Sequence, residues 1–163
     1  MSENLADVCR YLSHGVYVVG VASGELRHAF TAAWVMQVSF NPLLLAISIN
    51  PAHYSYQVLQ AGGVCTVNVL GQHQYALAEH FGRSGVTDKM AGFNWHTDQS
   101  GAPVLSESLA YFDCKVSHYT DAGDHKVAIC TVLAARQLQH GSPLLYGQTG
   151  TMDGSEKFYQ DAK

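Results

Sequence analysis

Runs of β-branched and aromatic residues recur along this chain, and short polar or glycine-containing segments separate them. Runs of this kind, bounded by turn-forming residues, are typical of β-strands. Extended strands are predicted at residues 15–22, 34–40, 43–49, 64–70, 109–118 and 126–138, with a short further one at 144–146. Because the strands outnumber the helical segments and follow one another through mostly short connections, the pattern favours a mainly β fold, an antiparallel barrel rather than a parallel α/β sheet.

Three segments have the periodicity of helices. In the first, Ser2–His14, apolar residues stand at positions 5, 8, 9 and 12 and share one helical face. The second, Pro51–Ala61, begins after an asparagine and ends at a Gly-Gly pair, and the third, Gln74–Phe81, ends at a glycine. No repeat or linker divides the chain, so we expect one domain over residues 1–150 and a polar C-terminal tail over residues 151–163.

Charged residues make up only 13% of the 163 residues, whereas a typical soluble domain has about 25%. Hydrophobic residues make up 47% and the formal net charge is -4, a composition that excludes intrinsic disorder. The 9 Lys and Arg residues are scattered and are outnumbered by 13 Asp and Glu, which argues against a nucleic-acid partner. The low charge leaves two explanations, an oligomer whose interface hides apolar surface or a barrel closed around a large ligand.

Several familiar signatures are absent from the sequence. The longest apolar run, Pro42–Ile47, is far shorter than the roughly 20 residues of a membrane-spanning helix, and the first residues lack the pattern of a signal peptide. We therefore expect a cytoplasmic protein with no membrane partner. The 4 cysteines are far apart, which indicates buried free thiols, and the 9 histidines show no metal-ligand spacing, so no metal is expected. Hydrolase, P-loop and Rossmann motifs are also missing from the sequence.

Four polar segments lie at the ends of apolar strands, where barrels usually place ligand contacts. They are His28–Trp34, Asn50–Ser55, Asp88–Gly92 and Asp121–His125. Each has a structural explanation beside a functional one. Trp34 suits a buried strand position or a ring-binding wall, and Asn50 suits a simple helix cap or the edge of a phosphate site. Lys89 suits a solvated loop or the counter-charge of a phosphate, and His125 suits an exposed turn or a reacting site.

Six short fragments, taken together and in this order, resemble the flavin reductase family, whose fold is the FMN-binding split barrel of antiparallel Greek-key type. They are Phe30–Ala32, Val38–Pro42, Val67–Leu70, Asp88–Gly92, Gly101–Leu105 and Asp121–His125. The resemblance extends from about Val8 to Gly150. It implies a homodimer in which each subunit binds one flavin near the subunit interface, FMN or alternatively FAD. It also implies that NAD(P)H passes a hydride to that flavin.

The resemblance assigns the flavin-binding role to particular positions. A flavin needs a flat apolar slot, backbone donors at the pyrimidine edge of its ring, and cations or helix amides for its phosphate. The ring-edge residues are expected to be Thr31, Ala32, Ala33 and Trp34, and Val38 and Ser39 of the next fragment are further cofactor-binding candidates. The ribityl and phosphate end is expected to contact Asn50, His53, Tyr54 and Ser55, with Asn68, Phe81, Arg83 and Lys89 as further contacts.

On the nicotinamide side, the resemblance implies that His125, with Gly123 and Asp124, lies at the open face of the flavin ring. His125 would orient the nicotinamide or supply a proton. Two departures from the family stand out, since many members have a small polar residue in place of Trp34 and an aromatic soon after the glycine matching Gly150. The expected role is an NAD(P)H:flavin oxidoreductase with a protein electron acceptor such as a monooxygenase. An electron carrier with tightly bound FMN, reduced by a protein partner, is the alternative, and a barrel for another apolar ligand is the third possibility.

Overall fold

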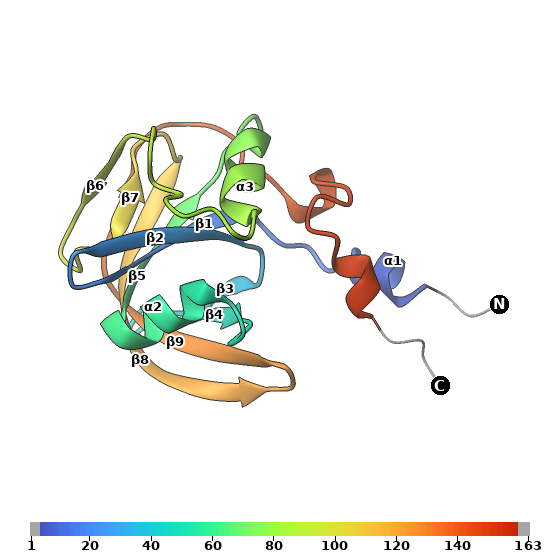
Figure 1. The fold of residues 1–163 in the computed structure, drawn as a ribbon, viewed down its shortest axis with the longest axis horizontal. Helices are drawn as coiled ribbons and strands as arrows, with labels where there is room; N and C mark the ends of the chain where they lie inside the picture. The colour runs from blue at the N-terminus through green and yellow to red at the C-terminus, as the bar shows by residue number, and fades with distance from the viewer. Residues whose placement is uncertain (1–3, 160–163) are drawn as a thin grey trace.

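Antiparallel strands dominate the computed structural model, which describes residues 4–159 (Figure 1). Seven of them form one sheet in the order β2-β1-β5-β8-β9-β4-β3, and β6 and β7 form a separate hairpin. Their bounds are β1 Tyr17–Ser23, β2 Leu26–Ala32, β3 Val35–Ser39, β4 Leu44–Ile49, β5 Val64–Val69, β6 Trp95–Thr97, β7 Pro103–Leu105, β8 Ala110–Ala122 and β9 His125–Gln137. The helices are α1 Leu5–Cys9, α2 Tyr54–Gly62 and α3 Tyr75–Gly82, with short 3-10 helices η1 Tyr146–Gln148 and η2 Ser155–Phe158.

The sheet curls but does not close, because its two edge strands are not paired with each other. Those edges are β2 and β3, which follow each other directly in the chain. Ala33 and Trp34 connect them across the open side of the sheet. The mainly β, antiparallel split-barrel fold predicted from the sequence is confirmed, with the sheet left open at this point.

Strand β1 lies in the middle of the core and is buried on both faces. Val19 and Val21 pack with Ile47 and Leu59 on the side that α2 covers, and Val18 packs with Phe81 on the side that α3 covers. Alternate residues of a strand point to opposite faces, so one continuous apolar run serves two clusters. This explains why Gly15–Ala22 has no alternation of polar and apolar residues.

The β6–β7 hairpin is attached to the sheet by a polar contact within the core. Asn68 of β5 donates from Nδ2 to the Val18 carbonyl at 2.9 Å and accepts at Oδ1 from the Leu105 N–H of β7 at 2.9 Å. A side chain at Gly20 would meet the Pro103 carbonyl, since a Cβ built there lies 2.2 Å from that oxygen. The close approach of the two backbones therefore requires glycine at position 20.

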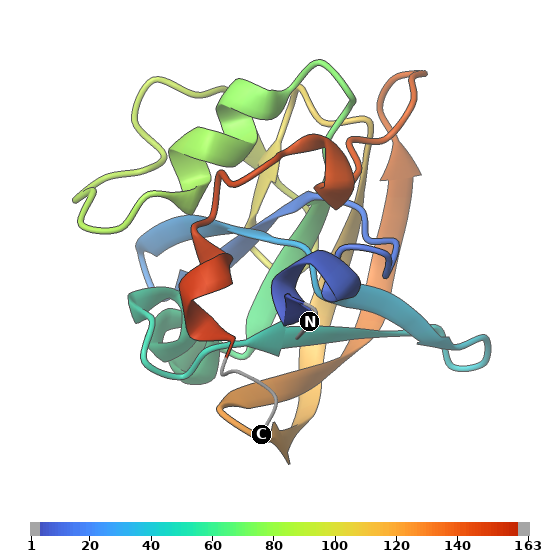
Figure 2. The same ribbon diagram turned by 90° about the vertical axis from the view of Figure 1, so that its right-hand side faces the viewer.

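Both ends of the described chain lie on one side of the sheet (Figure 1 and Figure 2). Helix α1 is shorter than the predicted segment 2–14, of which residues 1–3 lie outside the described part. It ends at Cys9, and tight turns follow in which Tyr11 and Leu12 donate to carbonyls three residues back. Arg10 binds Glu156 of η2 through an ion pair of 2.7 Å, which joins the two ends of the chain.

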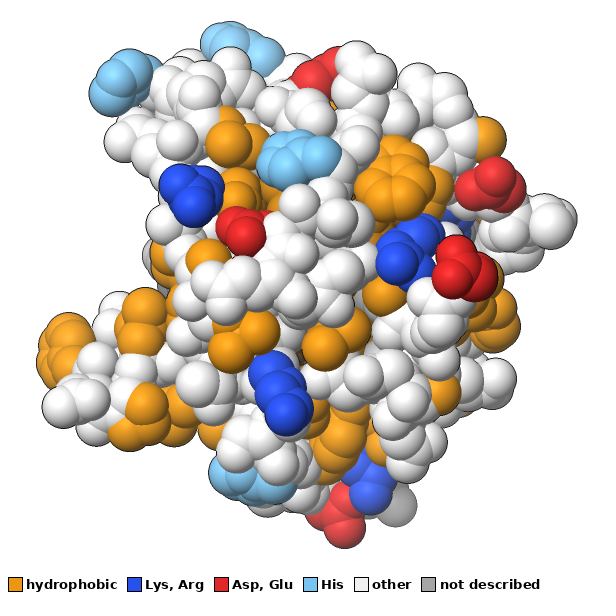
Figure 3. Space-filling view, turned by 90° about the vertical axis from the view of Figure 1, so that its left-hand side faces the viewer, with side chains coloured by type: hydrophobic (Ala, Val, Ile, Leu, Met, Phe, Trp, Pro, Cys, Tyr) orange, Lys and Arg blue, Asp and Glu red, His pale blue; other side chains and the backbone are white. Residues whose placement is uncertain are grey.

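The opposite side of the molecule carries Lys, Arg, Asp and Glu side chains that are interspersed without a patch of one sign (Figure 3). Within residues 4–159, no helix is long and apolar enough to cross a membrane, and no group of His, Cys, Asp and Glu is arranged to hold a metal ion. The four cysteines are free, as the sequence predicted; Cys65, Cys114 and Cys130 are buried, whereas Cys9 is only half-buried.

Candidate functional site

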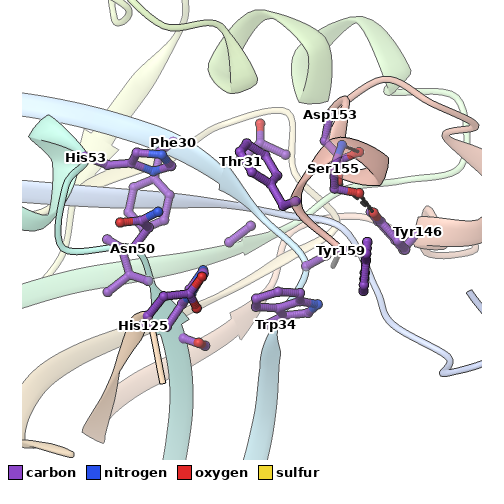
Figure 4. Close-up of a pocket in the computed structure, with 16 residues that line it drawn as sticks. Phe30, Thr31, Trp34, Asn50, His53, His125, Tyr146, Asp153, Ser155 and Tyr159 are labelled. Carbon is purple, nitrogen blue, oxygen red and sulfur yellow. Dashed lines mark hydrogen bonds and ion pairs between the residues drawn. The ribbon is translucent and has the colours of Figure 1, made fainter. Parts of the chain in front are cut away.

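A cavity of about 440 Å³ opens where β2 passes into β3. This volume lies within the range of roughly 300–1,000 Å³ that is usual for small-molecule sites. The segment 30–34 forms one wall, the end of β4 and the residues before α2 form another, and the β8–β9 turn and segment 146–159 complete it (Figure 4). Eight residues that the sequence predicted as site residues line it: Thr31, Ala32, Ala33, Trp34, Asn50, His53, Asp124 and His125.

The link between β2 and β3 presents free backbone donors. The N–H groups of Ala33 and Trp34 have no backbone partner within residues 4–159, although the Trp34 carbonyl accepts from the Ser48 N–H at 2.9 Å. The two alanines at 32 and 33 leave room for a flat group to approach the chain closely. Thr31 is fixed by its own hydroxyl, which donates to the Ala78 carbonyl of α3 at 2.6 Å. This wall therefore combines small side chains with unsatisfied donors.

The start of α2 lies at the other end of the cavity, where Figure 4 places Asn50 and His53. Asn50 accepts from the Ala52 N–H at 2.9 Å, and His53 occupies the N-cap without a side-chain capping bond. The N–H groups of Tyr54 and Ser55 have no backbone partner within the described chain. Free amides at a helix N-terminus carry partial positive charge and favour anions such as phosphate.

His125 lies at the start of β9, beside the connection between the two edge strands. Its Nδ1 lies 2.7 Å from Asp124 Oδ1, and its ring centroid lies 5.0 Å from that of Trp34. The hydrogen bond from His125 lowers the pKa of Asp124, so this carboxyl stays ionised. Nε2 of His125 has no hydrogen-bond partner within the described chain and remains available to a ligand.

Segment 146–159 supplies walls that the sequence did not point to. The Tyr146 hydroxyl donates to Asp153 Oδ2 at 2.6 Å and lies 3.1 Å from Ser155 Oγ (Figure 4). Burial raises the pKa of Tyr146, with a smaller contribution from Asp153. The lining residues not predicted from the sequence are Phe30, Ser48, Ile49, Tyr146, Asp153, Ser155, Phe158 and Tyr159. The adjacent aromatics Phe158 and Tyr159 in a polar stretch were the signal that could have found this wall.

Some predicted site residues lie outside the cavity lining, in the hairpin or around α2. Val38 is exposed and Ser39 half-buried in the β3–β4 hairpin. Tyr54 packs its ring edge-on to buried His28 at 5.2 Å, and Ser55 is buried in the first turn of α2. Gly123 occupies the β8–β9 turn with a φ of 62°, in the left-handed region that glycine adopts easily.

Others have their polar groups engaged within the protein. Asn68 is fully buried and hydrogen-bonded to Val18 and Leu105, as described above. Phe81 belongs to the core. Arg83 is exposed and pairs with Glu79 at 3.1 Å. Lys89 is buried and donates to the Phe81 carbonyl at 2.8 Å, and burial lowers the pKa of its ammonium group.

A family model for the flavin reductase like domain matches residues 9–155. The chain belongs to this family. The similarity covers both edge strands, the β8–β9 turn and segment 146–155, so it includes nearly every wall of the cavity. The resemblance noted in the sequence is confirmed.

Known proteins similar to this flavin reductase like domain differ in size. An FMN reductase (NADH) RutF of Agrobacterium fabrum is 32% identical over 136 residues, which cover 83% of this chain and 78% of that protein. A putative diflavin flavoprotein A 1 of Nostoc sp. is 34% identical over 128 residues, but the chain spans only 22% of its length. The crystal structure of a putative flavin reductase of Haemophilus somnus superposes with a TM-score of 0.83 and 26% identity, covering 89% of this chain and 94% of that one.

Proposed function

We propose that this chain is an FMN-dependent oxidoreductase that takes a hydride from NAD(P)H. The observation that carries the proposal is a cavity with free backbone donors at Ala33 and Trp34 in one wall and with Asn50 and His53 in another. His53 leads directly into the first turn of α2, whose Tyr54 and Ser55 amides have no backbone partner within the described chain. A flavin mononucleotide has the matching features, a ring with hydrogen-bond acceptors at one end and a phosphate at the other. FAD shares the same ring and first phosphate.

The walls between these ends suit a planar ring. Phe30, Ile49 and Trp34 are apolar or aromatic, and Ala32 and Ala33 add little bulk. A bound flavin would supply the redox chemistry by accepting the hydride from the nicotinamide. The residues of the chain bind and orient the two ring systems and exclude water from between them.

In this arrangement His125 positions the nicotinamide. Asp124 holds the Nδ1 side of the imidazole at 2.7 Å, and Trp34 packs against the ring, so two neighbours restrict its orientation. Nε2 is then the atom free to bind the nicotinamide carboxamide or to hold a proton. Gly123 allows the sharp turn that brings Asp124 and His125 to the cavity.

The proposal includes a homodimer that buries β3. Met36 and Val38 of β3 and the flanking Trp34 and Phe40 form an apolar segment, with a bulge between Gln37 and Ser39. All four apolar side chains are exposed, Met36 by 63% and Phe40 by 91%. Tyr11 and Leu12, which follow α1, are exposed as well. Apolar patches of this kind mark interfaces, and Trp34 belongs to both the patch and the cavity, so a second copy would lie beside the flavin.

An anaerobic titration of the purified protein tests this function. We expect the protein to bind FMN and the flavin absorbance to bleach on addition of NADH or NADPH. An Ala33→Phe variant fills the ring slot and should lose flavin affinity, whereas Ala91→Phe at an exposed turn should keep it. Failure to bind either FMN or FAD would overturn the proposal.

The same titration separates the second candidate, an electron carrier with tightly held FMN. The similarity to one module of a diflavin flavoprotein favours this alternative. Bound flavin that neither NADH nor NADPH bleaches, but that a reduced protein partner does, would assign the chain to that role. If the reduced flavin then passes its electrons to a monooxygenase, the electron acceptor is a protein.

A further inference from the structure

A second cavity of about 230 Å³ adjoins the first. It lies between α1 and segment 146–159, and we call it the terminal compartment; the 440 Å³ cavity is the flavin compartment. The two compartments share four lining residues, Trp34, Tyr146, Ser155 and Tyr159, so they lie side by side. The terminal compartment is smaller than most independent ligand sites. It therefore suits an extension of a ligand whose other end lies in the flavin compartment.

The two compartments differ in charge. Within residues 4–159, the lining of the flavin compartment includes Asp124 and Asp153 but no Lys or Arg. The lining of the terminal compartment includes Arg10 and His14 but no Asp or Glu. Carboxylates repel the phosphates of a ligand and a guanidinium attracts them. A long anionic ligand would therefore place its additional phosphates beside Arg10.

Arg10 has donors to spare. Its guanidinium carries five N–H groups, and its only side-chain hydrogen bond within the described chain runs from Nη2 to Glu156 Oε1 at 2.7 Å. The side chain is 29% exposed, so a ligand can reach it. The planar fork of arginine matches two phosphate oxygens at once. Glu156 holds the side chain in place but is not part of the compartment lining.

The remaining walls suit a nucleobase. Trp34, Tyr146 and Tyr159 are aromatic, and the ring of His14 packs edge-on against Tyr146 with centroids 6.1 Å apart. Aromatic side chains stack on the flat face of any base. A guanidinium beside aromatic walls thus provides both parts of a site for an adenosine diphosphate group.

We propose that the terminal compartment binds the adenosine diphosphate half of NADH, with the nicotinamide half beside His125. This inference rests on the proposed function. FAD carries the same group, but its diphosphate would continue from the flavin phosphate at the start of α2. Figure 4 places His53 and Tyr159 at opposite ends of the cavity, so that route leads away from Arg10. The adenosine diphosphate of the reductant is the one that the terminal compartment can reach.

Two variants that break the same ion pair test the proposal. Arg10→Gln removes the cation, and Glu156→Gln leaves it. With Arg10→Gln, we expect the KM for NADH to rise about tenfold, the effect of one lost charged hydrogen bond. The KM for reduced nicotinamide mononucleotide, which lacks the adenosine half, should stay unchanged. Glu156→Gln should leave the KM for NADH unchanged or lower it. Equal increases in both variants would show that only the ion pair matters and would overturn the proposal.

A binding measurement keeps this test separate from activity. Calorimetry with ADP-ribose and the FMN-loaded protein should show about tenfold weaker binding to Arg10→Gln than to the parent or to Glu156→Gln. Absence of NADH oxidation in the parent would overturn the proposed function, while the ADP-ribose affinities would still decide the role of the compartment. Weaker binding of FAD relative to FMN in Arg10→Gln, with NADH unaffected, would assign the compartment to FAD and overturn the proposal.

Discussion

The two edge strands of the sheet, β2 and β3, follow each other in the chain but have opposite surroundings. Strand β2 is covered by the chain itself, since α3 lies over it and Ala29 and Phe30 are buried. Within residues 4–159 no helix covers strand β3 in this way, and Met36 and Val38 are exposed. Each of the two strands pairs with a neighbour on one side only, but only β2 is covered by a helix. The difference supports the proposal that a second copy of the chain covers β3, whereas β2 is covered by the fold itself.

The cavity lies between these two edges, and this gives the difference a functional meaning. Thr31 and Ala32 belong to the self-covered side, and Trp34 and His125 belong to the side of β3, β4 and β9. A change on the β2 side should therefore act on folding, whereas a change on the β3 side should act on association and on the ligand. Four variants test this division.

Lysines at Met36 and Val38 should have the largest effect. In a two-fold dimer each substitution occurs twice in the interface, so the double variant M36K/V38K buries four charges. We expect dimer affinity to fall at least a thousandfold, about 4 kcal/mol, and flavin affinity to fall with it, as measured by light scattering and flavin titration. Leu26→Lys on β2 is the matched control, because Leu26 and Val38 are exposed by 43% and 44%. If the unsubstituted protein is itself a monomer in light scattering, the proposed difference between β2 and β3 is wrong.

Asn68→Ala tests the core beside β2, because Asn68 of β5 holds the Val18 carbonyl of β1, the strand that pairs with β2. The substitution leaves the buried Val18 carbonyl and the Leu105 N–H without their partner. We expect the free energy of unfolding to fall by about 2–4 kcal/mol, measured in denaturant at a fixed protein concentration. Asn94→Ala, at an exposed position, should change it by less than about 0.5 kcal/mol. Unchanged stability together with lost flavin affinity would show that Asn68 acts on the ligand and not on the fold.

His125→Ala should affect turnover rather than folding. Loss of the group that orients the nicotinamide is expected to lower kcat/KM for NADH about tenfold, about 1.4 kcal/mol, with flavin affinity nearly unchanged. Asp124→Asn, which keeps the ring but weakens its 2.7 Å contact, should have a smaller effect. His73→Ala in an exposed loop is the control. An unchanged rate and an unchanged KM for NADH in His125→Ala would remove this assignment.

The sequence predicted β3 but not the strand that precedes it. Strand β2 has the sequence Leu-Arg-His-Ala-Phe-Thr-Ala, which is poor in β-branched residues. It becomes a strand because a tight turn at Gly24 lays it against β1, with Val19 opposite Phe30. Pairing with a neighbouring strand determines the extended conformation of such a segment, and the β-propensity of its own residues does not predict it.

The parts of the site that could be predicted are those in which a short stretch of sequence determines where its own residues lie. Small residues before Trp34, the start of α2 and the Gly123–His125 turn are local features, and the structure places residues from all three at the cavity. Segment 151–159 was different, because its polar composition predicted a tail. Its contacts include the ion pair between Arg10 and Glu156, two residues 146 positions apart, and sequence spacing does not encode such a pair.

The smallest effect concerns His28, a buried histidine on the self-covered strand. Burial lowers its pKa below 6.5, and the charge of Lys89 lowers it further. The unfolded chain therefore binds a proton at a higher pH than the folded chain does, so the free energy of unfolding should fall as the pH falls below about 6.5. His28→Phe removes this titration while keeping a ring against Tyr54. Denaturant unfolding at several pH values should show a shallower loss of stability on acidification in the variant. An identical pH dependence would mean that His28 is free to take up its proton in the fold, and that β2 is less completely covered than its burial indicates.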